Sequence, residues 1–263
     1  IIKFINNTPP IGKSIVCLDD LNLRNILKKI KIKNFLTYGF NERSNYQITN
    51  LKYKLGYMQF NIKIRRHGFK KIVIKNIFLN LIGKHNVLNA TSAIAICLNL
   101  GVKIETIKRS LKNFSGVQRR LTKIFNKDRK EFYDDYAHHP TEIKAVLEGL
   151  RKVYKNRKII SVFQPHRYSR VKNLKKEFSM SFSKADKVIL CPIYAAGEKK
   201  DKKYDHKQFA RQISINSKVQ IIYIQNEDQL KRYLQKNLIA NEIIIGMGAG
   251  SISKWMQELK LKL

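Results

Sequence analysis

The second half of this 263-residue chain alternates between short apolar runs and amphipathic stretches. The apolar runs have the length and composition of β-strands and lie at residues 121–125, 131–136, 159–163, 187–190, 219–224 and 242–245. Helical patterns fall between most of them, and a last one covers 251–260. Only the first two runs, joined by the turn 126–130, have the pattern of a hairpin. This alternation predicts a doubly wound, mostly parallel sheet in an α/β fold.

The first part of the chain follows a different pattern. Two short strands are predicted at 14–18 and 35–38, with a helix between them. Three β-prone runs, interrupted at Gly56 and at 67–68, follow at 46–53, 58–65 and 71–79. They predict a small antiparallel meander. Two helical patterns complete this part, at 87–100 and 104–113.

The pattern changes near residues 116–120, which places a domain boundary there. We expect a partial α/β domain at 1–116 and a second domain at 117–263. Hydrophobic residues make up 43% of the chain, so packed cores are expected rather than disorder. The chain opens on Ile1 rather than Met, which suggests that the start of the protein is missing.

The formal net charge of +34 invites a nucleic-acid hypothesis, because lysines that neutralise phosphates gain affinity by counterion release. Here, however, the lysines are spread over nearly every predicted helix face and turn, without a dense tract or an aromatic-interleaved stripe. We therefore expect no nucleic-acid partner. A small anionic substrate such as a nucleotide would still be attracted to so basic a surface.

Cysteine spacing and hydropathy indicate the compartment. Cys17, Cys97 and Cys191 lie far apart in apolar surroundings, which fits neither a zinc motif nor a disulfide framework. Buried, reduced thiols of a cytoplasmic protein are the expectation. No apolar run approaches the roughly 18 residues that a membrane span requires, so no membrane partner is predicted.

The densest group of ionisable side chains lies between a predicted strand and the helix predicted at 141–154. It contains Asp134, Asp135, Tyr136, His138 and His139. In an open α/β sheet, ligands bind in the crevice at the carboxyl ends of the strands. A polar loop with solvated histidines is the alternative interpretation of this stretch.

Two pairs of arginines point to an anionic ligand. Arg167 and Arg170 follow the strand predicted at 159–163, which would place them on the same rim of the sheet as Asp135. Guanidinium groups suit carboxylate and phosphate. Arg119-Arg120, at the domain boundary, is consistent either with a clamp on a bound phosphate or with a solvated hinge.

Two glycine-containing stretches resemble phosphate-binding loops to different degrees. Gly12-Lys13-Ser14 has the last three residues of a P-loop, but it precedes a predicted strand instead of a helix and follows two prolines, so we do not expect it to bind phosphate. The stretch 246–250, which contains three glycines, follows a strand and opens a helix, where backbone N–H groups can face an anion. Tight strand–helix packing explains it equally well.

Several motifs together resemble the Mur ligase family of peptidoglycan synthesis. They are GKHNVLNA at 83–90, GVQRR at 116–120, DDYAHHPTE at 134–142, FQPHRYSR at 163–170, YAAGE at 194–198 and GAG at 248–250. The resemblance implies a three-domain enzyme of which this chain holds the last part of the central ATP-binding domain and a whole carboxy-terminal, Rossmann-like domain. The family's P-loop, its magnesium ligands and its UDP-binding domain would lie before Ile1, so we expect the chain alone to be inactive.

The resemblance also implies an activity and roles for named residues. ATP, with Mg²⁺, would phosphorylate the carboxylate of UDP-N-acetylmuramate, and the amino group of L-alanine would attack the acyl phosphate. The implied nucleotide contacts are His85 and Asn86 near the adenine, Asp135 on the ribose, and Arg119 and Arg120 near the phosphates. The implied catalytic and amino-acid contacts are His138, Arg167 and Arg170, with Tyr136 shaping that pocket. A fragment that binds a nucleotide or a partner without turnover is the alternative function.

Overall fold

The structure is a computed structural model and describes residues 2–30, 34–65, 71–201 and 204–262. The predicted break at 67–68 lies outside the described residues. The chain divides into two compact units, Ile1–Ser115 and Gly116–Leu263, which are described separately below.

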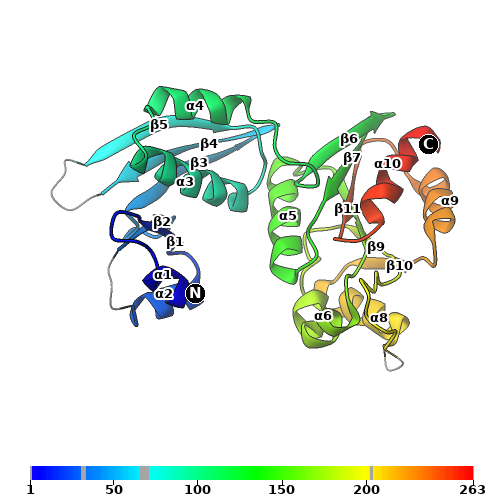
Figure 1. The fold of residues 1–263 in the computed structure, drawn as a ribbon. Coiled ribbons are helices and arrows are strands. Elements are labelled where there is room, and N and C mark those ends of the chain that lie inside the picture. The colour runs from blue at the N-terminus through cyan, green and yellow to red at the C-terminus, as the bar shows by residue number, and fades with distance from the viewer. Residues whose placement is uncertain (1, 31–33, 66–70, 202–203, 263) are drawn as a thin grey trace. The chain divides into compact units, whose positions relative to one another are not determined.

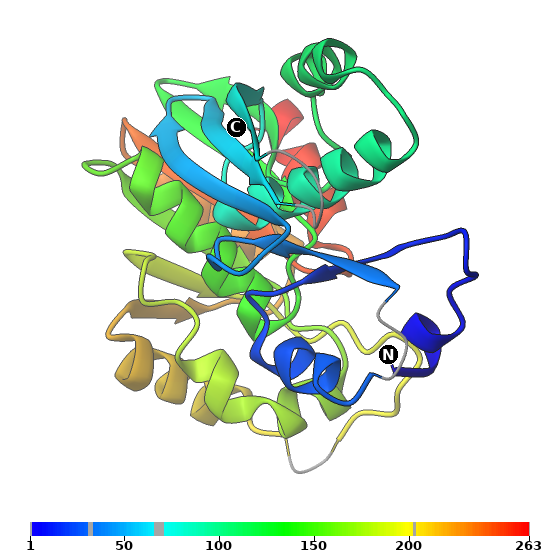
Figure 2. The same ribbon diagram turned by 90° about the vertical axis from the view of Figure 1, so that its left-hand side faces the viewer.

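The first unit is built on a five-stranded mixed sheet with the strand order β1-β2-β3-β4-β5. Its strands are β1 (Ser14–Cys17), β2 (Phe35–Gly39), β3 (Tyr46–Lys54), β4 (Tyr57–Ile64) and β5 (Ile72–Leu79). The meander predicted from the sequence is confirmed, because β3, β4 and β5 pair antiparallel (Figure 1 and Figure 2). It is not a separate sheet, however, since β3 also pairs parallel with β2.

Helices cover the sheet of the first unit. They are α1 (Ile2–Asn6), α2 (Leu21–Leu27), α3 (Lys84–Asn99) and α4 (Ile104–Asn113). The two long ones, α3 and α4, share one core with the sheet, in which Phe60 and Ile62 of β4 and Ile94 of α3 are fully buried. The short α2 belongs to a smaller cluster around Val16. Helix α3 begins three residues earlier than predicted, because Gly83, at φ +114°, turns the chain sharply and its carbonyl accepts from the amides of residues 86 and 87.

The second unit contains a six-stranded sheet with the order β10-β9-β8-β11-β7-β6. Its strands are β6 (Thr122–Lys127), β7 (Lys130–Asp135), β8 (Lys158–Phe163), β9 (Lys187–Leu190), β10 (Gln220–Tyr223) and β11 (Glu242–Met247). All neighbours pair parallel except the hairpin β6–β7. The prediction of a mostly parallel sheet that opens with a hairpin is therefore confirmed.

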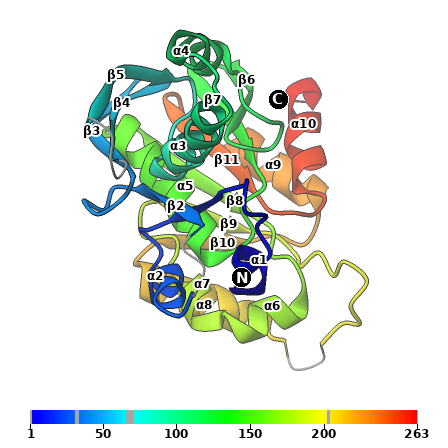
Figure 3. The same cartoon turned by 60° about the vertical axis from the view of Figure 1, so that its left-hand side comes forward.

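Helices lie on both faces of this second sheet. They are α5 (Pro140–Val153), α6 (Tyr168–Asn173), α7 (Lys175–Ser179), α8 (His206–Ser217), α9 (Glu227–Asn237) and α10 (Ile252–Lys262). Helices α5 to α8 form one core with alternate strand residues such as Ile159 and Phe163, whereas α9 and α10 form the other core with Ile160 and Val162 (Figure 1 and Figure 3). Successive strand side chains point to opposite faces, so strands buried on both sides are apolar throughout.

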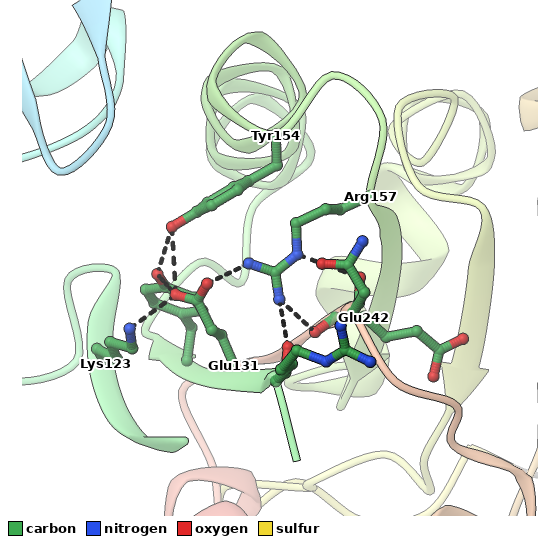
Figure 4. A network of polar contacts seen from close by, with 8 residues as sticks. Lys123, Glu131, Tyr154, Arg157 and Glu242 are labelled. Atoms are coloured by element: carbon green, nitrogen blue, oxygen red, sulfur yellow. Dashed lines mark hydrogen bonds and ion pairs between the residues drawn. The ribbon is translucent and has the colours of Figure 1, made fainter. Parts of the chain in front are cut away.

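A polar network closes the amino-terminal edge of the second sheet. The carboxylate of Glu131 pairs with Arg157 and Lys123 and accepts from the phenol of Tyr133. The guanidinium of Arg157 also donates to three backbone carbonyls, including that of Glu242 at 3.1 Å (Figure 4). These contacts join the first residues of β7 and β11 to the turn before β8, at the edge opposite the candidate site.

Candidate active site

Three adjacent strands of the second sheet end level with one another. In the sheet register Met247, the last residue of β11, pairs with Asp135 of β7 on one side and with Phe163 of β8 on the other. The loops that follow these strands therefore leave the same edge of the sheet. This arrangement brings the loop after Asp135, the loop before α6 and the glycine-rich turn before α10 together.

A row of rings crosses this edge from one loop to the next. The rings of Tyr136 and His138 meet edge to face with centroids 5.2 Å apart, and those of His138 and His166 are 5.8 Å apart. His166 stacks in turn on Tyr194, which follows β9, at 5.6 Å and 15°. The side chain of Arg170 ends beside this row, with a terminal nitrogen 3.2 Å from Nδ1 of His166. Three of the predicted residues, Tyr136, His138 and Arg170, thus lie in one array.

The turn around His138 and His139 holds the two imidazoles in different tautomers. Nδ1 of His138 lies 2.9 Å from the carbonyl of Tyr136, so this nitrogen carries the proton, and Nε2 is an acceptor while the ring is neutral. Nδ1 of His139 accepts from the amide of Thr141, so its proton is on Nε2. The carboxylate of Glu142 completes a capping box on α5 by accepting from both histidine amides.

The predicted ribose ligand Asp135 is engaged by its own chain. Its side chain is 2% exposed, and its two oxygens accept from the amides of Leu121 and Ala137, each at 2.7 Å. Burial raises the pKa of this carboxyl to about 6, although the two amides and Arg120 favour the charged form. Asp135 therefore anchors residue 121 and the turn after β7, and its contact with a ribose stays a prediction.

The two arginines at the start of the second unit differ in their surroundings. The guanidinium of Arg119 lies 4.6 Å from the ring centroid of Tyr136 and donates to the carbonyl of Gly248 at 2.7 Å. That of Arg120 lies 5.8 Å from the same ring. Arg120 is exposed, and among the described residues it has no hydrogen-bond acceptor. Arg120 thus offers its whole guanidinium to an anion, whereas Arg119 uses one terminal nitrogen on Gly248 and keeps a buried Nε without a hydrogen-bond partner.

The loop after β8 presents its two arginines differently. Arg167 precedes α6 with a left-handed backbone at φ 69°, its amide donates to the carbonyl of Tyr194, and its side chain is exposed. Arg170 lies inside α6, is half-buried and faces His166. The carboxylate of Glu198 accepts from the amide of Ser169, and hydrogen bonds from Ser169 lower the pKa of this carboxyl.

Close packing shapes the glycine-rich turn after β11. A Cβ at Gly248 would lie 2.7 Å from the carbonyl oxygen of Gln164, and one at Gly250 would lie 2.5 Å from Cγ of Tyr194. The buried amide of Gln164 caps α10 by accepting from the amide of Ile252 at 3.0 Å. Both glycines are thus required by the close approach of Gln164, after β8, and of Tyr194, after β9, and the tight-packing interpretation accounts for them.

Three residues at this edge of the sheet were not predicted as site residues. Gln164, His166 and Tyr194 lie inside the motifs that carried the family resemblance, but their roles depend on contacts between loops that are 28 or more residues apart. Only their presence in those motifs could have indicated them from the sequence.

The remaining predicted residues lie in the first unit. His85 and Asn86 occupy the first turn of α3, where the buried side-chain amide of Asn86 donates to the carbonyl of Ile82 at 2.8 Å. Lys13 and Ser14 of the P-loop-like triplet are held by Asn34 and Thr8 before a strand, so the triplet does not form a phosphate cradle.

Neither a metal cluster nor a membrane span is found in the part of the chain that the structure describes. No group of three or more His, Cys, Asp or Glu side chains there is arranged to hold a metal ion. In the same residues, no helix is long and apolar enough to cross a membrane.

Comparison with known protein families defines the class. The chain matches the Mur ligase middle domain over residues 2–97 and the Mur ligase, glutamate ligase domain over residues 119–250. It therefore belongs to the Mur ligase family, as the sequence motifs predicted.

Within the family, the chain is similar to ligases of one name. The chain is 49% identical over 258 residues to the UDP-N-acetylmuramate–L-alanine ligase of Pelagibacter ubique. This match covers 98% of the chain and 56% of that ligase. It is 40% identical to the ligase of the same name from Ruthia magnifica, over 95% of this chain and 53% of that one. The chain thus spans about half the length of the curated relatives it matches.

Solved structures agree on the fold. The UDP-N-acetylmuramate-alanine ligase of Thermotoga maritima superposes with a TM-score of 0.68 at 22% identity, covering 90% of this chain and 54% of that one. A murein peptide ligase of Psychrobacter arcticus superposes with a TM-score of 0.70 at 22% identity, and the match covers 99% of this chain and 53% of that one.

Proposed function

We propose that this chain forms the amino-acid-binding part of an ATP-dependent ligase that joins L-alanine to UDP-N-acetylmuramate in peptidoglycan synthesis. The observation that carries the proposal is the array of Tyr136, His138, His166 and Arg170 at the carboxyl edge of the second sheet. The relatives at 40% and 49% identity, whose names state this activity, support the choice of substrate.

The array suits an amino acid that attacks an acyl phosphate. Arg170 and Arg167 supply guanidinium groups for the alanine carboxylate, which forms its strongest hydrogen bonds with such donors. Neutral His138 presents an unprotonated Nε2, which accepts a proton from the alanine ammonium or its amine during attack. Once protonated, the same ring becomes a donor to the developing anion. No covalent nucleophile is needed, because positioning and charge stabilisation supply the rate.

The nucleotide contacts proposed from the family resemblance fit the structure unequally. Arg120 fits a role near the phosphates because its guanidinium is exposed and has no acceptor among the described residues. Arg119 fits that role less well, since it already donates to the carbonyl of Gly248. His85 and Asn86 are proposed to lie near the adenine, and Asp135 near the ribose.

Mg²⁺ belongs to the proposed reaction as the ion that neutralises charge on the ATP phosphates. The described residues offer no cluster to hold it. We infer that its ligands, the P-loop and the UDP-binding domain come from an upstream portion like that of the relatives, and that the enzyme acts in the cytoplasm, where its nucleotide substrates are made.

The test joins this chain to the missing half of a relative. The amino-terminal half of the Pelagibacter ubique ligase would be fused in frame, and ADP release would be measured with UDP-N-acetylmuramate, with and without L-alanine. We expect release that depends on L-alanine from the fused protein and none from the chain alone. A folded fusion without such release would overturn the proposal, and ATP binding by the chain alone without turnover would favour the alternative of a binding fragment.

A further inference from the structure

A cavity of about 550 Å³ lies at the carboxyl ends of two parallel strands in the first unit. The strands β1 and β2 pair in parallel, with Cys17 opposite Tyr38. Leu18, directly after β1, and residues 41–43, shortly after β2, line the cavity together with Arg24 and Lys28. Carboxyl ends of adjacent parallel strands are where α/β sheets bind ligands, and the volume lies in the range of about 300–1,000 Å³ found for small-molecule sites.

The walls of this cavity are held in place by the half-buried carboxylate of Asp19. Both oxygens of Asp19 are used, one by the amide of Phe40 and the other by the amide of Asn41, each at 2.9 Å. Gly39, at φ +147°, passes so close that a Cβ there would lie 2.6 Å from Asp19. The loop after β1 and the loop after β2 are therefore tied to each other, and the cavity between them is preformed.

The side chains around the cavity carry unneutralised positive charge. Arg24 and Lys28 lie one helical turn apart, and Arg43 stands across from them on the loop after β2. Among the described residues, no carboxylate comes within ion-pair distance of any of the three. Nε of Arg24 is buried and has no hydrogen-bond partner, which is a costly arrangement unless a ligand supplies an acceptor.

The other lining groups restrict the chemistry of the ligand. Glu42 is the single carboxylate of the lining, and its oxygens accept hydrogen bonds, as hydroxyl groups require. Asn41, with its side-chain amide, and Leu18, with its apolar side chain, complete the lining. A bare inorganic anion would use the cations only and would be repelled by Glu42.

We propose that this cavity binds a small phosphorylated metabolite that carries hydroxyl groups. Arg24, Lys28 and Arg43 hold its phosphoryl group, and Asn41 and Glu42 hold its hydroxyl-bearing portion. Two guanidinium groups and an ammonium match a dianionic phosphate monoester in charge and in donor geometry. The proposal does not rest on the ligase function proposed above.

The experiment titrates the chain with ribose 5-phosphate and glucose 6-phosphate, which carry no adenine, and follows backbone amides by NMR and heat by calorimetry. We expect saturable shifts at Leu18 and at 41–43, weaker binding of inorganic phosphate, and none of free glucose. Arg24→Gln and Lys28→Gln should each weaken binding by about tenfold, because each removes a charge-assisted hydrogen bond. Lys29→Gln is the matched control, since it removes the same charge from an exposed neighbour outside the lining.

Each outcome decides the proposal. It is overturned if neither sugar phosphate shifts these amides at about 10 mM, or if the shifts occur at other residues, such as 248–251. It is also overturned if Lys29→Gln weakens binding as much as Lys28→Gln. The last result would mean that the basic surface attracts phosphate generally. Lys28 is exposed, so its replacement leaves the fold intact and decides the test even if Arg24→Gln unfolds.

Discussion

Nδ1 of His166 lies 3.2 Å from a terminal guanidinium nitrogen of Arg170. A guanidinium only donates, so His166 must accept there, and its proton is on Nε2. Burial lowers the pKa of His166, and the charges of Arg170, His138 and Arg167 lower it further. His166 is therefore neutral at pH 7. Its contribution to the free energy of unfolding is fully present above pH 6.5 and is lost as the pH falls from 6.5 through the lowered pKa of the folded state.

These relationships predict the titration of His166. We expect two-dimensional imidazole NMR to show the Nε2–H tautomer and a pKa below 6.5, and Arg170→Gln to raise that pKa because it removes the nearest cation. Lys172→Gln, which removes an exposed cation from the same helix as Arg170, is the matched control and should leave the pKa of His166 unchanged. A proton on Nδ1 of His166 at pH 7 would contradict the geometry.

Arg167 and the amino-acid substrate provide a kinetic prediction. In the fused ligase, Arg167→Ala should raise KM for L-alanine by about 10-fold or more, the value of a charge-assisted hydrogen bond, with a much smaller effect on KM for ATP. Lys172→Ala, which removes an exposed cation from α6, the helix that Arg167 precedes, should change neither constant by more than about twofold. Equal effects of Arg167→Ala on both substrates would remove Arg167 from the alanine site.

We expect Asp135 and its neighbour Asp134 to differ in how much their replacement by Asn lowers the free energy of unfolding. Asp135→Asn leaves one acceptor oxygen for two amide donors, those of Leu121 and Ala137, so the amide group of the asparagine must face an N–H. We expect a loss of about 1–3 kcal/mol in the free energy of unfolding. Asp134→Asn should cost less, because the hydroxyl of Ser253 can rotate to suit either group. Urea unfolding of both variants checks the order, and a larger loss for Asp134→Asn would refute it.

The network at the amino-terminal edge predicts a pH dependence. Hydrogen bonds from Lys123 and Arg157 lower the pKa of Glu131 from 4.5 to about 2 against the opposing effect of its burial. The depressed folded value means that its stabilisation is present above pH 4.5 and is lost as the pH falls towards 2. Glu131→Gln should therefore lower the free energy of unfolding at pH 7 by about 2–3 kcal/mol. The free energy of unfolding of this variant should also decrease less steeply than that of the unmodified chain as the pH falls from 4.5 towards 2.

Asp128→Asn is the matched control for Glu131→Gln. Asp128 pairs with Lys130 at 3.3 Å, but its side chain is 66% exposed, so the pair should contribute less than about 1 kcal/mol. Urea unfolding between pH 7 and pH 2.5 distinguishes the two variants. An unchanged acid slope in Glu131→Gln would show that other carboxylates control the acid transition.

Much of the fold could be predicted from the sequence because its patterns are local. The apolar runs at 159–163 and 242–245 and the helical pattern at 141–154 correspond to β8, β11 and α5 within one or two residues. The short helix α1 was not predicted, and α6 and α7 were given no bounds, since five or six residues give no measurable period. The pairing of β2 with β3, which merges the meander with the parallel strands, depends on contacts that no local pattern records.

The sequence by itself determined the alternation of strand and helix, the family and the residue types at the sheet edge, because periodicity and motif spacing are properties of the chain before it folds. Only the tertiary structure decided which donors face which acceptors. It placed Arg119 on the carbonyl of Gly248, gave both oxygens of Asp135 to backbone amides, and set His166 beside Arg170. The reason is physical: a hydrogen bond forms over about 3 Å, and such distances between loops far apart in the chain exist only after the sheet has set its register.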